Sequence, residues 1–338
     1  MKTAGFYVKA GACPNSDKPQ PCYGHIVRCI ALADELERRG FRCRFNTNED
    51  GWRIVERLGF ERTNGISEHD VWISDLPGGT SPTLAQALRN KSRALVILNG
   101  TGYPDGDPGR LLADLTIYQG RTERPRRLNW DGAKGEWHEG PRYLILRREF
   151  RLWSAARELG MIPCLSDELQ RVVIAGGGVD AHNITERVVD ALGGSKLQLR
   201  VIIGPGNTTF APQGGIETIR TPRSMARALA WADVAVVSYG MTALECLALG
   251  LPTVALSISR GHETSADLVQ DETDGALTSL GLVDDVSADS IRRTVMDLVE
   301  AQRRWNGLDL EGKARRYIDG RGVERVVDLI EGKLKEAK

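Results

Sequence analysis

The sequence predicts an α/β protein that contains two doubly wound domains. Short apolar runs that end in Gly, Pro or Asn alternate with amphipathic stretches along the whole chain, a pattern typical of parallel sheets covered by helices. A series of strand, glycine turn and helix occurs in each half of the chain. A chain of 338 residues is also too long for a single domain of ordinary size. We therefore expect two Rossmann-like domains that face each other across a cleft, with ligands at the carboxyl ends of the strands.

The first half contains the following predicted elements. The strands are Ala4–Lys9, Arg42–Asn46, Asp70–Ser74, Arg93–Leu98, Asp114–Tyr118 and Tyr143–Leu146, and the helices are Gly24–Arg39, Gly51–Leu58, Pro82–Asn90 and Arg148–Leu159. Residues 119–141 are rich in Arg, Gly and Trp without periodicity, so we expect a long excursion there, which is either functional or disordered. Its Trp130 and Trp137 either stack on a sugar face or anchor the loop to its own domain.

The second half repeats the alternation. Its strands are Arg171–Ala175, Gln198–Ile203, Gly215–Ile219, Val234–Val237 and Thr253–Leu256, and its helices are Ala181–Leu192, Ser224–Trp231, Met241–Leu249, Glu263–Asp271, Ala288–Trp305 and Gly322–Lys335. A break in the helical pattern near residues 150–170 marks the domain boundary. We expect an N-terminal domain over residues 1–150, a C-terminal domain over 165–320, and a last helix over 321–338 that packs back towards the N-terminal domain.

Composition excludes several classes of partner. The chain contains 45 basic residues (Lys and Arg) and 45 acidic residues (Asp and Glu), so its net charge is zero. We therefore expect no overall electrostatic attraction to nucleic acid or to an anionic membrane. No apolar run is long enough to span a membrane, and no signal peptide is predicted, so we expect a cytoplasmic protein. The six cysteines form no C-x-x-C pair and the five histidines are scattered, so neither a metal site nor a cofactor is predicted.

The segment Ser238–Glu245 predicts a phosphate-binding turn. It follows an apolar strand, and a tight turn at Gly240 leads into a helix that begins near Met241 or Thr242. The free N–H groups and the positive dipole end of such a helix favour a diphosphate. Glu245, one turn inside, could accept hydrogen bonds from a ribose diol. The alternative is an ordinary strand–helix turn in which Glu245 only interacts with the helix dipole.

The segment Pro21–Cys29 contains a second glycine turn and a candidate base. Gly24 opens a helix with an apolar face, and His25 lies in its first turn, where we expect it to point towards the cleft. A histidine in that place suits general base catalysis, and Arg28, one turn on, could meet phosphate or carboxylate. The alternative is that His25 caps the helix and Arg28 is solvated.

The third turn, Ala175-Gly-Gly-Gly-Val-Asp-Ala-His-Asn183, lies between a strand and a helix. A dinucleotide fingerprint needs an acid at the end of the next strand, but that strand ends in Gly204-Pro-Gly-Asn207. A dehydrogenase is therefore disfavoured. What remains is a turn that approaches a diphosphate or a sugar, with Asp180 or Asn183 as helix caps in the alternative.

Several motifs in order resemble the nucleotide-sugar enzymes of GT-B architecture. The likeness is to the UDP-sugar hydrolase of the pseudaminic acid pathway and its spore-coat-polysaccharide relatives, which are similar to glycosyltransferase family 28. It rests on Gly24-His-x-x-Arg-Cys29, Tyr143-Leu-Ile-Leu-Arg-Arg-Glu-Phe150, Gly177-Gly-x-Asp-x-x-Asn183, Gly240-x-Thr-x-x-Glu245 with Gly250-x-Pro252, and Asp319-Gly-x-Gly322 with Arg325-Val326. These motifs span nearly the whole chain.

The resemblance implies a UDP-sugar substrate, with catalysis by His25 and Arg28 and no need for a metal. It implies nucleotide and phosphate binding by Gly24, Gly177, Gly178, Gly240, Met241, Thr242 and Glu245, and base binding by the backbone of Gly204, Thr221 and Met225. The candidates for the sugar or acceptor side are Asp75, Asn99, Asp180, Asn183, His262 and Glu263. His25 would activate water or an acceptor hydroxyl against the anomeric carbon, and the helix N-terminus would stabilise the departing diphosphate.

The chain departs from the family pattern where the sugar or acceptor is expected. The differences are Cys22 for the first Gly of G-x-G-H, Tyr239-Gly-Met241 for Gly-Gly-Ser, Leu98-Asn-Gly100 at a strand end that usually carries acids, Leu-Pro-Gly-Gly after Asp75, and His262-Glu263 for Asn-Gln. The resemblance favours hydrolysis of the UDP-sugar with water as acceptor. The altered residues favour the alternative, transfer of the sugar to a small-molecule or glycan hydroxyl. A nucleotide-sugar sensor is a third reading, disfavoured because both His25 and Arg28 are present.

Overall fold

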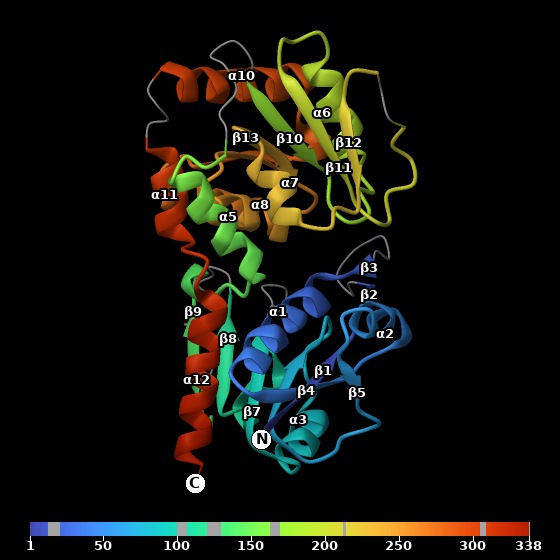
Figure 1. Cartoon of the computed structure of the whole chain (residues 1–338), viewed down its shortest axis with the longest axis vertical. Coiled ribbons are helices and arrows are strands. Elements are labelled where there is room, and N and C mark those ends of the chain that lie inside the picture. Colours follow the sequence, from blue (N-terminus) through green and yellow to red (C-terminus); the bar gives the residue numbers. More distant parts are fainter. Residues whose placement is uncertain are drawn as a thin grey trace. The chain divides into compact units, whose positions relative to one another are not determined.

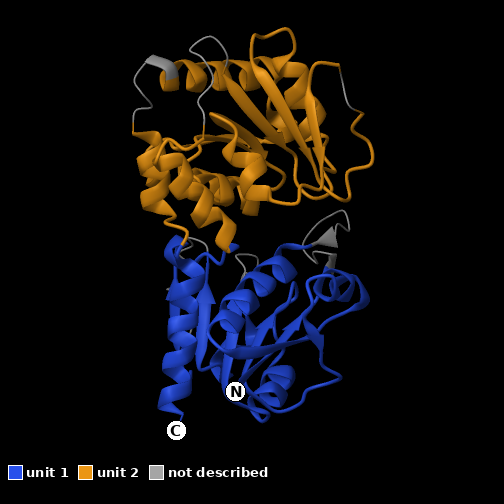
Figure 2. Ribbon diagram, viewed as in Figure 1, with its two compact units in different colours: residues 1–147, 321–338 blue, residues 148–320 orange. Residues whose placement is uncertain are grey.

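The structure is a computed structural model that describes residues 1–12, 21–99, 107–119, 130–162, 170–211, 214–304 and 309–337. The chain forms two compact units, shown in different colours in Figure 2. Unit 1 contains Met1–Arg147 and Arg321–Lys338, and unit 2 contains Arg148–Gly320. Each unit has one large parallel sheet with helices packed on it, so the prediction of two Rossmann-like α/β domains is confirmed.

Unit 1 is built on a seven-stranded parallel sheet in the order β5-β4-β1-β6-β7-β8-β9 (Figure 1). The strands are β1 (Lys2–Val8), β4 (Phe41–Asn46), β5 (Glu61–Arg62), β6 (His69–Asp75), β7 (Ser92–Asn99), β8 (Leu115–Tyr118) and β9 (Glu136–Glu139), and β2 (Gly11–Ala12) pairs with β3 (Pro21–Cys22) in a separate ribbon. The helices are α1 (Gly24–Arg38), α2 (Glu49–Glu56), α3 (Pro82–Arg89), α12 (Gly322–Glu336) and the short 3-10 turns η1 (Pro108–Leu112) and η2 (Pro141–Tyr143).

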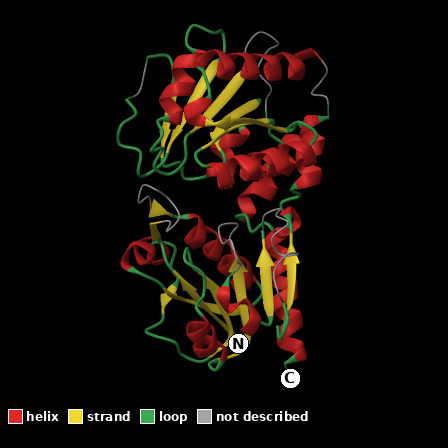
Figure 3. Ribbon diagram, turned by 180° about the vertical axis from the view of Figure 1, so that it is seen from behind, coloured by secondary structure: helices red, strands yellow, loops and turns green. Residues whose placement is uncertain are grey.

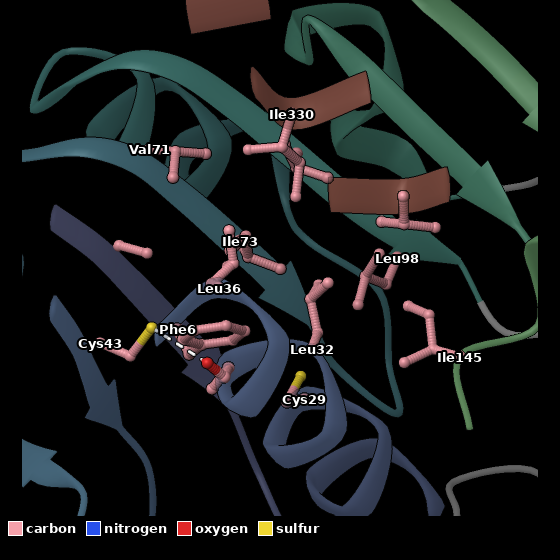
Figure 4. Close-up of a cluster of buried hydrophobic side chains, with 14 of the residues drawn as sticks. Phe6, Cys29, Leu32, Leu36, Cys43, Val71, Ile73, Leu98, Ile145 and Ile330 are labelled. Carbon is pink, nitrogen blue, oxygen red and sulfur yellow. Dashed lines mark hydrogen bonds between the residues drawn. The ribbon is translucent and has the colours of Figure 1, made fainter. Parts of the chain in front are cut away.

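The main core of unit 1 lies between its sheet and two helices that are far apart in the sequence. Helix α1 buries Cys29, Leu32 and Leu36 at helical spacing, and Figure 4 shows these side chains beside Phe6 of β1 and Ile330 of α12. Gly322 lets α12 begin close to the preceding chain, because an added Cβ there would lie 2.1 Å from the Leu144 carbonyl oxygen. The last helix therefore belongs to unit 1, packed against α1, β7 and β8.

Unit 2 contains a six-stranded parallel sheet in the order β12-β11-β10-β13-β14-β15. The strands are β10 (Arg171–Ala175), β11 (Gln198–Ile203), β12 (Glu217–Arg220), β13 (Val234–Ser238), β14 (Thr253–Ser257) and β15 (Leu277–Leu282). The helices are α5 (Arg148–Glu158), α6 (Ile184–Leu192), α7 (Met225–Ala230), α8 (Met241–Ala248), α9 (Arg260–Glu272), α10 (Ala288–Arg304), α11 (Leu310–Tyr317) and the 3-10 turn η3 (Val283–Asp285). Figure 3 shows the helices and strands of both units from behind.

Several local predictions differ from the structure. The predicted strand Tyr143–Leu146 is wrong, because Tyr143 is the last residue of the 3-10 turn η2 and residues 144–146 pair with none of the described strands. The strands β9 and β15, the short strands β2, β3 and β5, and the helix α11 were not predicted. No helix among the described residues has both the length and the apolar character that crossing a membrane requires.

The described part of the 119–141 excursion is tied to unit 1. Trp130 stacks on Trp137 with ring centroids 5.5 Å apart, and both rings meet Tyr118 edge-on. These contacts match the alternative in which the tryptophans anchor the loop to its own domain. The remainder of the excursion, which includes the basic run from Arg121 to Arg127, lies outside the described residues.

Candidate active site

The sheet of unit 1 has a topological switch point between β1 and β6. From β1 the chain first adds β4 and β5 on one side, and then returns to add β6, β7 and β8 on the other. The loops that leave neighbouring strands at such a point diverge and leave a crevice at their carboxyl ends. His25 lies in the segment after β1, and Asp75 is the last residue of β6, so the fold brings these two residues together.

His25, Arg28 and Asp75 form one buried cluster at this switch point. The Nδ1 atom of His25 is 2.6 Å from Oδ1 of Asp75 and 2.8 Å from Nη2 of Arg28. The guanidinium of Arg28 donates from Nε and Nη2 to the two carboxylate oxygens of Asp75. The side chains of His25 and Arg28 are 11% and 9% exposed, and that of Asp75 is fully buried.

The alternative reading of this turn does not match the structure. Tyr23, not His25, occupies the N-cap position of α1 and makes no side-chain capping hydrogen bond. Arg28 is buried and ion-paired instead of solvated. Asp75 was expected among the residues on the sugar or acceptor side, but its carboxylate lies beneath His25 and Arg28 with no exposed surface.

The electrostatics of the cluster keep Asp75 ionised. Burial by itself raises the pKa of Asp75, but the positive charges of Arg28 and His25 and their hydrogen bonds outweigh burial, so the pKa lies below its ordinary value. The shorter contact of Nδ1, to the ionised Asp75, favours the tautomer in which Nδ1 carries the proton and Nε2 keeps its lone pair, while Nη2 of Arg28 donates to Asp75 and not to Nδ1. In that tautomer Nε2 can accept a proton from a substrate. Burial raises the pKa of the neighbouring Cys29 thiol well above its ordinary value, so Cys29 stays protonated.

The sheet of unit 2 has its own switch point, between β10 and β13. The glycine turn after β10 and the turn at Gly240 after β13 flank it, and Ser238 Cβ lies 4.0 Å from the Cβ position of Gly177. Gly177 has a φ of 100°, which favours glycine, and a Cβ added to Gly204 would lie 2.4 Å from the Gly177 carbonyl oxygen. The three predicted binding glycines Gly177, Gly178 and Gly204 are therefore adjacent.

Asp180 and Asn183 begin helix α6, and Asp180 has a clear capping role. Its Oδ1 accepts the N–H of Ile184 at 2.7 Å, and its Oδ2 accepts the N–H of Thr185 at 3.0 Å. Oδ2 also accepts a hydrogen bond from the side-chain amide of Asn207. Asp180 therefore acts as a helix cap, as in the alternative interpretation, and the whole residue is 7% exposed. Asn183 has a left-handed φ of 53° and makes no side-chain cap.

Gly240 and the first turn of α8 present backbone donors at the same switch point. Gly240 has φ 156° and ψ −151°, a conformation that residues with a side chain rarely adopt. Gly240 is the N-cap residue of α8, so no side chain caps the helix there. A Cβ added to Gly240 would have no atom within 4 Å. Met241 and Thr242 in the first turn are partly exposed, whereas Glu245 is buried with 6% exposure. The N–H groups of this turn can bind an anion.

Thr221 and Met225, predicted to meet the base, lie beside the carboxyl ends of β11 and β12. Thr221 has a φ of 47°, which is uncommon for a β-branched residue, and its N–H donates to the Ile203 carbonyl oxygen at 3.1 Å. Met225 opens α7, which Ser224 caps through the N–H of Arg227. The unusual backbone at Thr221 sits next to Gly204 in the fold, but its role in base binding stays a prediction.

His262 and Glu263 lie in the first turn of α9, which packs against β14 and β15. The rings of His262 and Tyr239 meet edge-on with centroids 5.9 Å apart. Burial lowers the pKa of His262 and raises that of Tyr239, so both rings are neutral at neutral pH. Glu263 is paired with Arg260 at 2.8 Å. The side chain of Asn99, at the end of β7, lies outside the described residues.

Among the described residues, no group of three or more His, Cys, Asp or Glu side chains could hold a metal ion. Sequence reasoning assigned His25 and Arg28 to one helix face but did not connect them to Asp75. It also missed Asp107, a buried carboxylate before η1. The pair Asp107-Pro108, an N-cap residue before a proline, was the local signal for that turn.

Comparisons with known proteins find distant relatives of this chain. No protein-family model matches the chain. The spore coat polysaccharide biosynthesis protein SpsG of Bacillus subtilis is 24% identical over 91% of this chain and 94% of its own. The N-acetylglucosamine transferase of Halorhodospira halophila that acts on N-acetylmuramyl-(pentapeptide) pyrophosphoryl-undecaprenol is 26% identical over 70% of this chain and 75% of its own. An uncharacterized protein of Methanocaldococcus jannaschii, MJ1062, is 24% identical, and the match spans about half (52%) of its length.

Solved structures agree with this fold over nearly the whole chain. MurG of Acinetobacter baumannii superposes with a TM-score of 0.64 at 16% identity, covering 98% of this chain and all of its own. The glycotransferase of kitacinnamycin gives a TM-score of 0.67 at 16% identity, covering 98% of this chain and 99% of its own. The chain therefore has the GT-B fold of glycosyltransferases.

Proposed function

We propose that this protein is a glycosyltransferase that moves a sugar from a UDP-sugar to a hydroxyl group of a glycan or small-molecule acceptor. The His25–Asp75 pair at the switch point of unit 1 is the observation that carries the proposal. The fold supports it, and so does the similarity to a named transferase over 70% of the chain. A structure with the same fold, HepE of Anabaena, was solved with UDP and with UDP-glucose, which supports UDP as the leaving group.

Transfer fits the comparisons better than hydrolysis. The relatives and solved structures whose names state a reaction are transferases. The residues that depart from the hydrolase pattern, such as Tyr239 and His262, are those expected on the sugar or acceptor side. We therefore take a hydroxyl group as the acceptor in place of water.

In the proposed reaction, Nε2 of His25 removes the proton of the acceptor hydroxyl. The acceptor oxygen then forms a bond to the anomeric carbon while the bond from that carbon to the β-phosphate oxygen breaks. UDP leaves with the bonding electron pair, and the backbone N–H groups at the start of α8 stabilise the added negative charge. Asp75 holds Nδ1 of His25 protonated, and Arg28 holds Asp75 in its ionised form.

Nucleotide binding is assigned to unit 2. Gly177, Gly178 and Gly240 allow the main chain to approach the diphosphate, because a Cβ at these places would narrow the crevice. Glu245 accepts hydrogen bonds from the ribose hydroxyls, and the backbone of Thr221 and Met225 contacts the uracil. Asp180 acts indirectly, because its carboxylate already caps α6.

The test measures UDP release from a panel of UDP-sugars with and without candidate acceptors. Release that depends on an acceptor supports transfer, and equal release in water supports hydrolysis. We expect His25→Ala to lower kcat by about 10²- to 10⁴-fold, the usual contribution of a general base, while the Kd for UDP stays unchanged.

The matched control is His138→Ala, which removes a partly buried imidazole of β9 that bonds to Tyr143. It should keep the wild-type kcat. Normal turnover by His25→Ala would contradict the base assignment. UDP binding without release under every condition would leave a nucleotide-sugar sensor as the better reading.

A further inference from the structure

A second buried carboxylate bridges two segments beside the His25–Asp75 pair. Asp107 precedes η1 and is 2% exposed. Its Oδ1 accepts the N–H of Gly109 at 2.8 Å, and its Oδ2 accepts the N–H of Thr80 at 2.8 Å. The first bond caps η1, whereas the second connects η1 to the segment that follows β6.

Thr80 carries this connection to the strand that ends in Asp75. The hydroxyl of Thr80 lies 2.8 Å from the hydroxyl of Ser74, the residue before Asp75, and both residues are fully buried. Residues 76–79 therefore form a closed turn, and the N–H of Gly79 donates to the Leu76 carbonyl oxygen inside it. A shift of Thr80 would displace the residues on both sides of Asp75.

The fit between the turn and η1 leaves little room for adjustment. A Cβ added to Gly109 would lie 2.8 Å from the Thr80 carbonyl oxygen. Gly79 has a φ of 76°, which favours glycine, and an added Cβ there would approach Asp107 Oδ2 to 3.6 Å. Backbone packing therefore holds Asp107 directly against this turn.

The charge on Asp107 is coupled to that on Asp75. Burial and, to a smaller extent, the negative charge of Asp75 on β6 raise the pKa of Asp107 to about 6, although the N–H groups of Thr80 and Gly109 act to lower it. On η1, the charged neighbour is Arg110, whose guanidinium donates to the Asp107 carbonyl oxygen at 3.2 Å. Protonation removes one of the two acceptor oxygens and the charge that acts on Asp75.

We propose that Asp107 is a positioning residue for the His25–Asp75 pair, which it holds in place through its hydrogen bond to Thr80 and the contact of Thr80 with Ser74. This inference rests on the proposed function, because it assigns a role in turnover to a residue that touches no substrate. Asp107 does not react. It fixes the direction of the Asp75 carboxylate, and Asp75 in turn fixes the ring of His25.

The test compares the wild type with Asp107→Asn, which keeps the size of the side chain but removes the charge and one acceptor. We expect kcat to decrease by up to about tenfold, because a small misplacement of a catalytic group slows the reaction. The KM for the UDP-sugar should stay unchanged. We also expect the NMR titration of the His25 ring, assigned by its loss in His25→Ala, to move to lower pH because a nearby negative charge is gone.

Asp70→Asn is the matched control. Asp70 lies at the other end of β6, where its carboxylate accepts the N–H and hydroxyl of Thr3. It should leave kcat within about twofold and the His25 titration unchanged, because its carboxylate bonds to Thr3 and Arg93, at the end of β6 away from Asp75. A second variant, Thr80→Val, removes the Ser74 contact but keeps the backbone N–H, and it should lower kcat in the same direction.

The outcomes separate this inference from the proposed function. An unchanged His25 titration and kcat in both Asp107→Asn and Thr80→Val would overturn the positioning role. If Asp107→Asn fails to fold, Thr80→Val alone decides the question by the same two measurements. A His25 titration that moves in Asp107→Asn, together with normal turnover in His25→Ala, would support the coupling but refute His25 as the base.

Discussion

Replacement of Asp75 by Asn should destabilise unit 1 strongly. The side chain of Asp75 is fully buried, and Arg28 is 8% exposed, so loss of the carboxylate charge leaves the guanidinium in the interior without this counterion. Removal of one partner from a buried ion pair costs about 3–5 kcal/mol. The free energy of unfolding of unit 1 should fall by that amount at pH 7.

The double variant Asp75→Asn/Arg28→Met provides the matched control. It removes both charges and keeps an apolar chain of similar length, so it should be more stable than Asp75→Asn alone. If the double variant is the less stable of the two, the loss comes from packing and not from an uncompensated charge.

The pH dependence of stability gives an independent check on Asp75. Its pKa is lowered in the folded state from an ordinary value of 3.8, so the stability it contributes is complete above that value. That contribution is lost as the pH falls below 3.8 through the folded-state pKa. The difference between wild type and Asp75→Asn should therefore shrink at acidic pH.

Hydrogen exchange followed by mass spectrometry is a suitable assay, because it reports each unit separately. Peptides from β6 and α1 should exchange faster in Asp75→Asn, while peptides from β10 and β13 in unit 2 serve as an internal reference. A loss below about 1 kcal/mol in β6 and α1, the range of an exposed ion pair, would refute the reasoning.

Two further predictions concern backbone strain and buried charge. Gly240→Ala should destabilise unit 2 by about 1–3 kcal/mol, because its φ of 156° strains any side chain, and it should weaken UDP binding. Calorimetric melting and titration calorimetry would measure both effects, and an unchanged melting temperature would contradict the first. The pKa of Asp107 rises on folding from 3.8 to about 6, so protonation should stabilise the wild type by about 1.3 kcal/mol between pH 7 and pH 5. Urea unfolding at the two pH values should show that this gain is absent in Asp107→Asn, and an equal gain in both proteins would argue against the raised pKa.

The parts of the fold that the sequence predicted are the strands buried on both faces. The strands β10 and β11 match their predicted bounds because each contains a run of buried apolar residues, Val172–Ala175 in β10 and Val201–Ile203 in β11, as is typical of parallel strands. The edge strands β9 and β15 were not predicted because their compositions are not typical of buried strands. The strand β9 contains Glu, Trp and His, and β15 contains Thr, Ser and Gly. Such strands depend on a neighbouring strand more than on their own composition.

The prediction of a strand at Tyr143–Leu146 failed for a specific physical reason. Its apolar side chains are buried as a strand's would be, so the hydrophobic pattern was misleading. The N–H of Ile145, however, donates to the side-chain oxygen of Gln119 at 3.0 Å instead of to another strand. A side-chain acceptor from a distant loop cannot be recognised from local sequence, and it satisfies the backbone without a ladder.

The candidate site was predictable only where its residues are close in sequence. His25 and Arg28 are three residues apart on one helix, so their proximity follows from helical periodicity. Asp75 joins them because β6 pairs with β1, which is a property of strand order and not of spacing. Asp107 and Thr80 are 27 residues apart and meet only through the turn after β6.

The two switch points have the same topology but different chemistry. In unit 1, ionisable side chains lie at the switch point between β1 and β6, and the Asp75 carboxylate is placed to control the proton on His25. In unit 2, glycines and the N-terminus of α8 lie at the switch point between β10 and β13, and they offer backbone N–H groups and no charge of their own. Proton removal needs a side chain whose charge can change, whereas a departing diphosphate needs fixed dipoles that do not. The difference between the two switch points therefore matches the two demands of the proposed glycosyl transfer, and it explains why His25→Ala should affect turnover while Gly240→Ala should affect nucleotide binding.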